Sequence, residues 1–218
     1  MHLKKYLKVR INKKCIIKQM YKYEQELINK GIKYIAGCDE AGRGPLAGPL
    51  VAAACILPVN YKNDLIDDSK KMTEKNREKA FKQIKKDALD FNIQIITPED
   101  VDKLNPKEAS RIAMTNAIKG LKQQPEHVLV DYETIYVDIE QQGIKKGDTL
   151  SISIAASSIL AKVTRDRIMQ EYGKQYPEYG FENHKGYGTK KHKEALKKYG
   201  ITDIHRKSYK PVKDILDK

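Results

Sequence analysis

Hydrophobic residues follow two kinds of pattern along this chain. Short apolar runs bounded by glycine, proline or charged residues are typical of strands, whereas apolar residues spaced three and four apart are typical of helices. The run PLVAAACIL at 49–57 is apolar at nearly every position, which predicts a central strand buried on both faces. Together the short runs predict five strands, at 34–40, 49–57, 91–95, 126–131 and 134–139.

Helical spacing and capping residues separate these strands. A helix is predicted to begin at Thr73, because a threonine N-cap precedes a stripe of apolar residues. A second helix start is predicted where Asn105 is the cap, Pro106 the first helical residue and Glu108 the capping-box glutamate. Further helices are predicted over 150–172 and, ended by Gly200, over 190–199. This order predicts an α/β fold, with one mixed sheet flanked by helices and a helical C-terminal segment.

Length and charge divide the chain unevenly. With 218 residues and 40% hydrophobic residues, the chain can form one large domain with its own core. We predict that domain at 34–218, preceded by a short basic extension at 1–33. The extension carries ten Lys and Arg against Glu24 and Glu26, a charge of +8, which leaves +5 of the total +13 for the rest. Such a concentration favours nucleic acid as partner, with a membrane surface as the alternative.

The cysteines and the apolar segments bear on the compartment. The three cysteines are odd in number and lack C-x-x-C spacing, so neither a disulfide framework nor a zinc site is predicted. The longest mostly apolar run, 46–58, is interrupted by Gly48 and Pro49 and falls short of the roughly 20 residues that a spanning helix needs. The basic extension lacks the continuous apolar segment of a secretory signal. We therefore expect a cytoplasmic protein without a membrane span.

Acidic residues end two of the predicted strands. Asp39 and Glu40 end the first strand and lead into Gly42-Arg43-Gly44, and Asp131 ends the run VLVD. One aspartate in such a place is more often a turn or cap residue, but ligand sites form where strand ends meet. Several carboxylates in a basic protein suit Mg²⁺ or Mn²⁺, which prefer oxygen ligands and bring phosphate oxygens into their coordination shells.

Long motifs in a fixed order carry a family resemblance. They are DEAGRGPLAGPLVAAACILP, DDSKKMTEKNRE, VLVD, SISIAASSILAKVTRDRIM and HKGYGT. From about residue 33 to its end, the chain resembles bacterial type 2 ribonucleases H (ribonuclease HII). The resemblance implies a ribonuclease H-like fold and two-metal hydrolysis of the RNA strand in RNA/DNA hybrids. It also implies cleavage on the 5′ side of ribonucleotides embedded in duplex DNA, leaving 3′-hydroxyl and 5′-phosphate ends.

The same resemblance assigns roles to individual residues. The four acids that would bind Mg²⁺ or Mn²⁺ are Asp39, Glu40, Asp131 and Asp148. The 2′-hydroxyl would be recognised by the Gly42-Arg43-Gly44 backbone together with Tyr187, whose ring would pack on the neighbouring deoxyribose. Further candidates for substrate contact are Lys162, Arg165, His184 and Lys185, with Ser69, Lys70 and Arg206 in similar segments; each can also be read as solvated surface. No protein partner is identifiable, and we expect a monomer.

Several residues leave alternatives open. Asp138 and Asp166 compete with Asp148 as the fourth acid, although Asp166 lies between two arginines and is expected to pair with them on a helix surface. Two residues depart from the family pattern: Tyr132, which is expected to crowd the metal site or alter substrate fit, and Ser157. The extension is either a phosphate clamp, a disordered tail or a helix that packs through Ile16, Ile17, Met20 and Tyr23.

Other functions remain alternatives. A nucleic-acid-binding protein without activity would explain the positive charge but not the acids at several strand ends. An exonuclease or resolvase of related fold would explain the acids, but exonucleases of the DEDD type space their first two acids as D-x-E, whereas Asp39 and Glu40 are adjacent. Ribonuclease HIII is similar across the core, but its turn usually lacks G-R-G and it carries a larger N-terminal domain.

Overall fold

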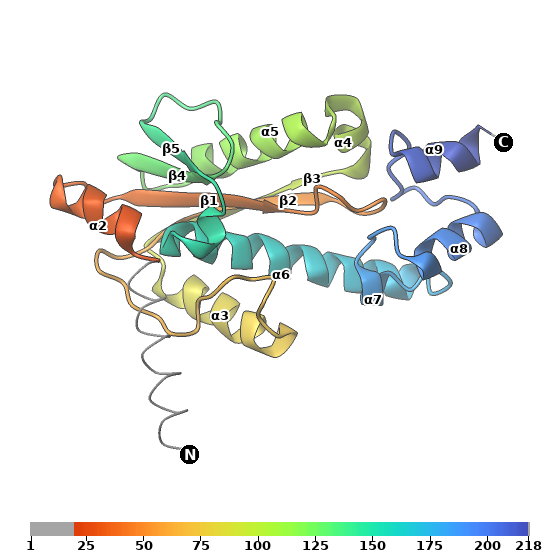
Figure 1. Ribbon diagram of the computed structural model, residues 1–218, viewed down its shortest axis with the longest axis horizontal. Coiled ribbons are helices and arrows are strands. Elements are labelled where there is room, and N and C mark those ends of the chain that lie inside the picture. The colour runs from red at the N-terminus through yellow and green to blue at the C-terminus, as the bar shows by residue number, and fades with distance from the viewer. Residues whose placement is uncertain (1–19, 218) are drawn as a thin grey trace, which may run out of the picture.

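The strands form one mixed sheet in the computed structural model, which describes residues 20–217. Within these residues the five-stranded sheet has the order β3-β2-β1-β4-β5 (Figure 1). β1 pairs antiparallel with β2, and β2 with β3, whereas β4 runs parallel to both β1 and β5. The strands are β1 (Ile35–Ala41), β2 (Leu50–Ile56), β3 (Asp90–Ile96), β4 (His127–Asp131) and β5 (Gln141–Ile144). The predicted α/β class and mixed sheet are confirmed.

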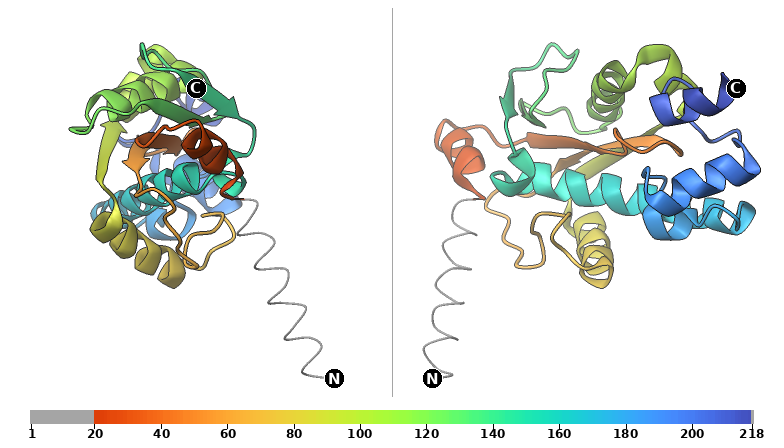
Figure 2. Two further views of the ribbon diagram at one scale, coloured as in Figure 1. Left: turned by 90° about the vertical axis from the view of Figure 1, so that its left-hand side faces the viewer. Right: turned by 45° about the vertical axis from the view of Figure 1, so that its right-hand side comes forward.

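Helices cover both faces of the sheet (Figures 1 and 2). α3 (Glu74–Asp87) and α6 (Ile152–Gln175) pack on one face, and α4 (Pro98–Leu104) and α5 (Pro106–Lys119) on the other. α2 (Lys22–Asn29) lies at one end of the sheet, and a helical C-terminal segment lies at the opposite end. That segment contains α7 (Phe181–His184), α8 (Lys190–Tyr199) and α9 (Lys210–Leu216).

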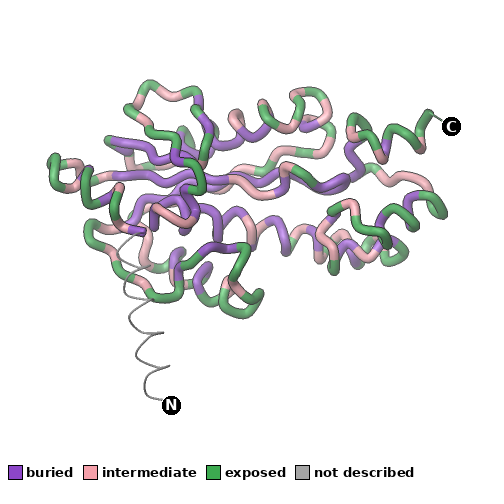
Figure 3. Tube along the Cα trace, viewed as in Figure 1, coloured by how far each residue is buried: buried purple, intermediate pink, exposed green. Residues whose placement is uncertain are grey.

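The central strand β2 supplies side chains to two cores. Every residue of β2 is buried, which confirms the strand predicted from the unbroken apolar run. Because successive side chains of a strand point to opposite faces, Val51, Ala53 and Cys55 join the core with α3 and α6, while Ala52 and Ala54 join the core with α5. The buried trace in Figure 3 follows this strand, β1 and much of α6.

Helix α6 lies directly on β1, the strand that carries the first two acids. A side chain at Gly37 would put its Cβ 2.0 Å from the carbonyl carbon of Ser153, so only glycine allows this approach. Ser157 Oγ donates to Gly37 O at 2.9 Å and to Ser153 O at 3.0 Å. The hydroxyl of Ser157 therefore belongs to the contact between helix and sheet.

The predicted helix starts at Thr73 and Asn105 and the predicted end at Gly200 are observed, whereas the helix predicted over 150–172 spans Ile152–Gln175. Thr73 Oγ1 accepts from Asn76 N, and Asn105 Oδ1 accepts from Lys107 N and Glu108 N. Glu108 was expected to bond back to the cap, but its carboxylate accepts from Tyr136 Oη at 2.9 Å. Gly200, with φ of +78°, ends α8. These starts and ends depend on neighbouring residues, so they are readable from the sequence.

The predicted strand at 134–139 is wrong. This segment is a loop, and the fifth strand is β5, which begins two residues later. Because β5 runs parallel to β4, the chain must first cross back along the sheet. Ile135 is buried in the core of α5, and Gln141 holds it through two hydrogen bonds of 2.9 Å. The alternating apolar residues pack on a helix and do not pair in the sheet.

The described part of the basic extension packs on the domain. Met20 is 3% exposed and joins the core of α3 and α6, and Tyr23 packs beside Leu27 of α2. Met20 and Tyr23 therefore both pack on the domain, but Met20 lies in a turn before α2, and Ile16 and Ile17 lie outside the described residues, so the predicted helical face stays a prediction. The division of the chain at residue 33 stays a prediction. In the described range 20–217, no helix combines the length and apolar character that a bilayer crossing requires.

Candidate active site

A cleft of about 190 Å³ opens where β1 and β4 end. The two strands run parallel with Cys38 beside Val130, so the next residues, Asp39 and Asp131, reach the same edge of the sheet. The cleft is lined by Asp39, Glu40, Ala41, Gly42, Arg43, Gly44, Ser69, Lys70, Asp131, Ser158, Lys162, Arg165 and Tyr187. Residues from distant parts of the sequence thus meet around three of the four predicted acids.

These three acids carry negative charge that the protein compensates poorly. Asp39 is 3% exposed, and burial, followed by the charges of Glu40 and Asp131, holds its pKa well above the usual range. Burial also raises the pKa of Glu40, although Arg43 acts in the opposite direction. Burial raises the pKa of Asp131 too, despite the hydrogen bond of 2.7 Å that Gly147 N donates to its Oδ1. Clustered carboxylates of this kind attract a cation.

Asp148 lies beside this group, in the 3₁₀ turn η1 (Gly147–Thr149) that precedes α6. It is buried, and its Oδ2 accepts from Lys70 Nζ at 2.8 Å. Its charge contributes to the raised pKa of Asp131, so the two carboxylates are neighbours. Lys70 therefore balances the one acid of the four that does not line the cleft.

The two alternatives for the fourth acid lie differently. Asp138 is exposed, in the loop before β5. Asp166 is buried and pairs with Lys162 at 2.6 Å and with Arg77 at 3.9 Å. The expected pairing of Asp166 along the helix is observed with Lys162, four residues earlier, but Asp166 is buried and not on the surface. Asp148, unlike Asp166, lies close enough to Asp131 for its charge to raise the pKa of that carboxyl, which favours Asp148.

The donor set fits a hard cation. All four side chains offer carboxylate oxygens, the ligands that Mg²⁺ and Mn²⁺ prefer, and three of them lack a full counter-charge. In the part of the chain that the structure describes, no three such side chains already meet closely enough to form a finished ion site. The groups that now hold Asp131 and Asp148 are Gly147 N and Lys70 Nζ.

The glycine-rich loop on the other side of the cleft is held by two buried arginines. Arg206 donates to Gly42 O at 2.6 Å, to Arg43 O at 3.1 Å and to Gly48 O at 2.8 Å. Arg165 donates through its three nitrogens to the carbonyls of Pro49, Ala47 and Lys185, at 2.9, 3.1 and 2.9 Å. Both side chains are at most 1% exposed. Backbone carbonyls therefore accept from the guanidinium groups of both residues. Arg165 also lines the cleft, and the predicted substrate contacts of Arg165 and Arg206 stay predictions.

Arg43 links the loop to the acids. Its Nη2 lies 2.6 Å from Glu133 Oε1 and its Nη1 lies 3.5 Å from Glu40 Oε1. Glu133 is buried and was missed in the sequence, where it is one acid in a loop of polar and aromatic residues. Its position two residues after Asp131 is the only signal that the sequence offers.

Tyr187 faces the same loop from the segment after α7. Its side chain is 46% exposed, and a Cβ built on Gly44 would lie 3.8 Å from Tyr187 Cε1. The ring centroid is 6.0 Å from the guanidinium carbon of Arg165. The structure thus brings together the two groups that the family resemblance pairs for recognition of a sugar.

The remaining predicted contacts divide between the cleft and the scaffold. Lys162 lines the cleft, with its Nζ donating to Asp166.

Both ring nitrogens of His184 are occupied, by Tyr179 O at 2.8 Å and by Gly186 N at 3.2 Å, so its predicted substrate contact is corrected to a structural role. Lys185 donates its Nζ to Glu182 O and does not line the cleft. Tyr132 is 65% exposed and does not line the cleft, so it does not crowd the acids.

Two serines lie near Asp39, and only one of them was predicted from the sequence. Ser69 Oγ and Ser158 Oγ lie 2.9 Å apart, and the Ser158 hydroxyl lowers the pKa of Asp39 against the stronger effect of burial. Ser69 was a candidate for phosphate contact, but Ser158 was not singled out. It lies in a run of small residues that is explained equally well by close packing of α6 on β1.

The chain is similar to known proteins over most of its length. The family model described as ribonuclease HII matches residues 36–212. A ribonuclease HII from Clostridioides difficile (strain 630) is 54% identical over 195 residues, which cover 89% of this chain and 76% of that protein. The ribonuclease H2 structure from Pyrococcus horikoshii OT3 superposes with a TM-score of 0.72 at 26% identity, covering 84% of this chain and 97% of that one. The ribonuclease HIII designated Bst, solved in complex with Mn²⁺, reaches 0.59 at 14% identity, covering 85% and 70%, and shows the shared fold alone.

Proposed function

Because the chain belongs to the ribonuclease HII family, and is therefore an endoribonuclease that acts on RNA/DNA hybrids with divalent metal ions, we propose that it also cuts on the 5′ side of single ribonucleotides in duplex DNA. One observation carries the proposal. The acids at the ends of β1 and β4 share a cleft with the loop Gly42–Gly44 and with Tyr187. A site for phosphodiester hydrolysis therefore adjoins a surface able to contact one sugar closely.

The acids are proposed to hold the metal. Asp39, Glu40, Asp131 and Asp148 would bind two ions, Mg²⁺ or Mn²⁺, with Lys70 released from Asp148. When bound, two such ions activate water on one side of the phosphorus and stabilise the leaving 3′-oxygen on the other, which gives 3′-hydroxyl and 5′-phosphate products. The protein groups keep the carboxylates in place: Gly147 N holds Asp131, and Ser158 supports Asp39.

The loop and the tyrosine are proposed to select the sugar. With its carbonyls held by Arg206, the backbone of Gly42–Gly44 can present its N–H groups to a 2′-hydroxyl, the group that distinguishes RNA from DNA. The ring of Tyr187 would pack on the deoxyribose next to the cut, and Arg43 and Lys162 would lie near the phosphates. Selection then depends on one ribonucleotide and needs no base-specific contact.

The proposal also covers the compartment and the oligomeric state of the protein. We propose a cytoplasmic protein, since Cys38 and Cys55 are buried free thiols, as suits a reducing compartment. We also propose that the protein is a monomer. Sedimentation in solution checks the monomer, and a protein that sediments as a dimer at micromolar concentration contradicts it.

The test is cleavage of a closed, end-blocked DNA duplex that contains one internal ribonucleotide. We expect a single internal cut with Mg²⁺ or with Mn²⁺, a ligatable 5′-phosphate on the downstream product and no reaction after chelation. Asp39→Asn should not cut, whereas Asp138→Asn is the matched control because Asp138 is an exposed acid outside the cleft.

Three outcomes contradict the proposal. Binding without cutting favours a nucleic-acid-binding module. Reaction only after an end is opened favours an exonuclease. Cleavage of hybrid tracts with no cutting at the single ribonucleotide leaves the family activity intact but removes the proposed selection by the Gly42–Gly44 loop and Tyr187.

A further inference from the structure

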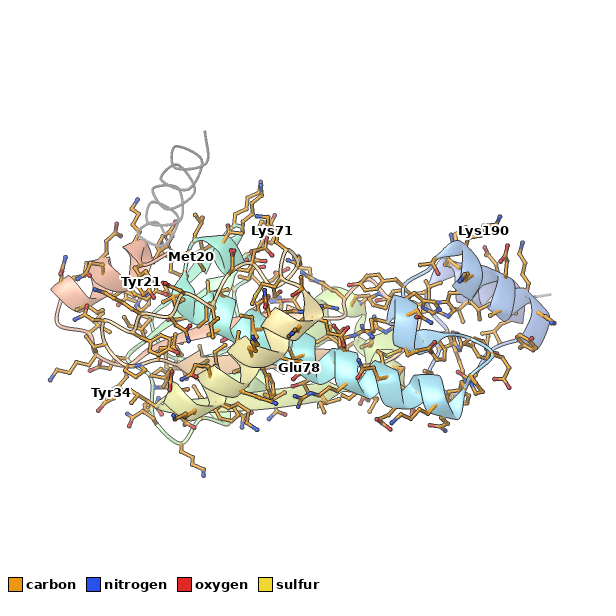
Figure 4. The ribbon with its side chains drawn as sticks, turned by 90° about the horizontal axis from the view of Figure 1, so that it is seen from below. Met20, Tyr21, Tyr34, Lys71, Glu78 and Lys190 are labelled. Atoms are coloured by element: carbon orange, nitrogen blue, oxygen red, sulfur yellow. The ribbon has the colours of Figure 1, made fainter. Side chains whose placement is uncertain are left out.

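The beginning of α6 is held by residues of α2 and of the turn before it, although about 130 residues separate the two segments in the sequence. Glu24 Oε1 accepts from Ser151 Oγ at 2.5 Å and from Ser153 N at 3.0 Å, and Met20 O accepts from Ile152 N at 2.8 Å. Ser151 is also the N-cap residue of α6. Met20 is labelled in Figure 4, at the end of the molecule opposite Lys190. N–H groups that the first turn of a helix leaves unpaired are thus satisfied by another element.

Glu24 is an unusual residue for this task. It is 5% exposed, burial raises its pKa, and its second oxygen Oε2 is buried with no hydrogen-bond partner among the described residues. An aspartate or serine within the helix itself can cap a helix start without burying a carboxylate from elsewhere. A small cavity of about 30 Å³, lined by Glu24, Tyr21, Lys33 and Ser153, adjoins the carboxylate and has room for water.

The capped turn is connected to the acids by a short chain of hydrogen bonds. Ser151 N donates to Gly147 O at 2.9 Å, and Gly147 N donates to Asp131 Oδ1 at 2.7 Å. Asp148 lies in the same turn, between Gly147 and Ser151. Movement of the first residues of α6 would therefore shift Asp148 and the Gly147 N–H that orients the Asp131 carboxylate, whereas the backbones of Asp39 and Asp131 are held in β1 and β4.

We propose that Glu24 is a positioning residue of the metal site. Its carboxylate fixes the first turn of α6, and that turn places Asp148 and the Gly147 N–H that orients Asp131. The inference rests on the proposed metal role of these acids. It gives the described part of the basic extension a task in metal binding, separate from any contact with nucleic acid.

The test measures Mn²⁺ affinity of the protein without substrate, by titration calorimetry, beside thermal melting. Glu24→Ala removes the acceptor, and we expect Mn²⁺ affinity to fall about 10- to 100-fold, the usual range for residues that orient metal ligands. Glu24→Gln keeps an acceptor oxygen for Ser151 and Ser153, so it should restore most of the affinity. Glu26→Ala is the matched control, because Glu26 is an exposed glutamate of the same helix.

The outcomes separate this inference from the proposed function. If Asp131→Asn leaves Mn²⁺ affinity unchanged, the proposed metal site itself is wrong. If Asp131→Asn abolishes binding while folded Glu24→Ala binds Mn²⁺ as the wild type does, only the positioning role is wrong, and a lower melting temperature then marks Glu24 as a packing residue.

A second variant covers the case in which Glu24→Ala does not fold. Ser151→Ala removes one of the two donors to Glu24 and leaves Ser153 N in place. We expect a smaller loss of Mn²⁺ affinity, about 3- to 10-fold. Unchanged affinity in folded Ser151→Ala overturns the proposal.

Discussion

The two sides of the cleft differ in how far the protein satisfies its own polar groups. On the acid side, burial and mutual repulsion raise the pKa values of Asp39, Glu40 and Asp131. On the loop side, the guanidinium groups of Arg165 and Arg206 are buried, and their donors are matched by backbone carbonyls. The carboxylates of the acid side lack full counter-charges, whereas the guanidinium groups of the loop side have hydrogen-bond acceptors, although burial lowers the pKa of both arginines.

The difference fits what each side is proposed to bind. Carboxylates that are not neutralised cost folding free energy but leave a strong attraction for an ion that arrives from solution. A loop that must present backbone N–H groups at fixed positions works best when its carbonyls are already held. In the proposed function, the acid side therefore depends on an added cation, whereas the loop side depends on the buried guanidinium groups of Arg165 and Arg206.

The largest expected effect comes from neutralising the acid side. Asp131→Asn should lower kcat by about two to three orders of magnitude, because a neutral amide is a poor ligand for a hard cation. The same substitution should raise the melting temperature of the metal-free protein, since it removes repulsion with Asp39 and Asp148. Single-turnover cleavage and melting measure the two effects. Loss of both activity and stability would show that Asp131 is structural.

The loop side should respond in the opposite way. Arg206→Lys keeps the charge but loses the planar group that reaches several carbonyls. We therefore expect the free energy of unfolding to fall by about 2–3 kcal/mol and cleavage at a single ribonucleotide to become slower. Denaturant unfolding measures the stability. Arg167→Lys is the control, because Arg167 is an exposed arginine paired with Glu78. Equal stability of the two variants contradicts the anchoring role of Arg206.

A smaller effect is expected where the loop side meets the substrate. Tyr187→Ala should reduce cleavage at an isolated ribonucleotide about tenfold, the scale of a single aromatic contact with nucleic acid. Because the ring is 46% exposed, the melting temperature should change little. Tyr187→Phe keeps the ring and should retain activity. A sharp drop in melting temperature with normal cleavage identifies Tyr187 as a packing residue.

The smallest effect is a dependence of stability on pH that belongs to the acid side. A carboxyl whose pKa is raised in the folded protein destabilises it above that pKa, and the penalty is absent below the unfolded pKa of about 4. The melting temperature of metal-free Asp39→Asn should therefore exceed that of the wild type by a margin that grows as pH rises. Saturating Mg²⁺ should stabilise the wild type and close the gap.

Two buried histidines change stability with pH in the opposite direction. The wild type and Asp39→Asn must therefore be compared with each other at each pH. Burial lowers the pKa values of His192 and His205 to about 4, and their Nε2 atoms lie 3.0 Å apart. The unfolded chain then binds protons more readily between about pH 4 and pH 6.5, so acid destabilises both proteins equally. A margin between Asp39→Asn and wild type that stays constant across pH 5 to 9 would argue against a raised pKa for Asp39.

Local sequence determined much of the framework. The strand at β2, the caps at Thr73 and Asn105 and the end of α8 at Gly200 depend on residues close in the chain, and all were readable from it. Asp39 and Asp131 were placed together for a similar reason: apolar runs end at each of them, and the ends of parallel strands meet at one edge.

Only the tertiary structure decided the rest. The loop at 134–139 alternates like a strand, but the parallel pairing of β5 places it against α5. The sequence showed Arg165 and Arg206 as basic residues suited to phosphate, and burial made them anchors for carbonyls. Glu24 acquires its partners only when segments 127 and 129 residues apart come together. Hydrophobic period and capping are properties of neighbouring residues, whereas strand partners and the burial of a charge depend on contacts that the local sequence does not encode.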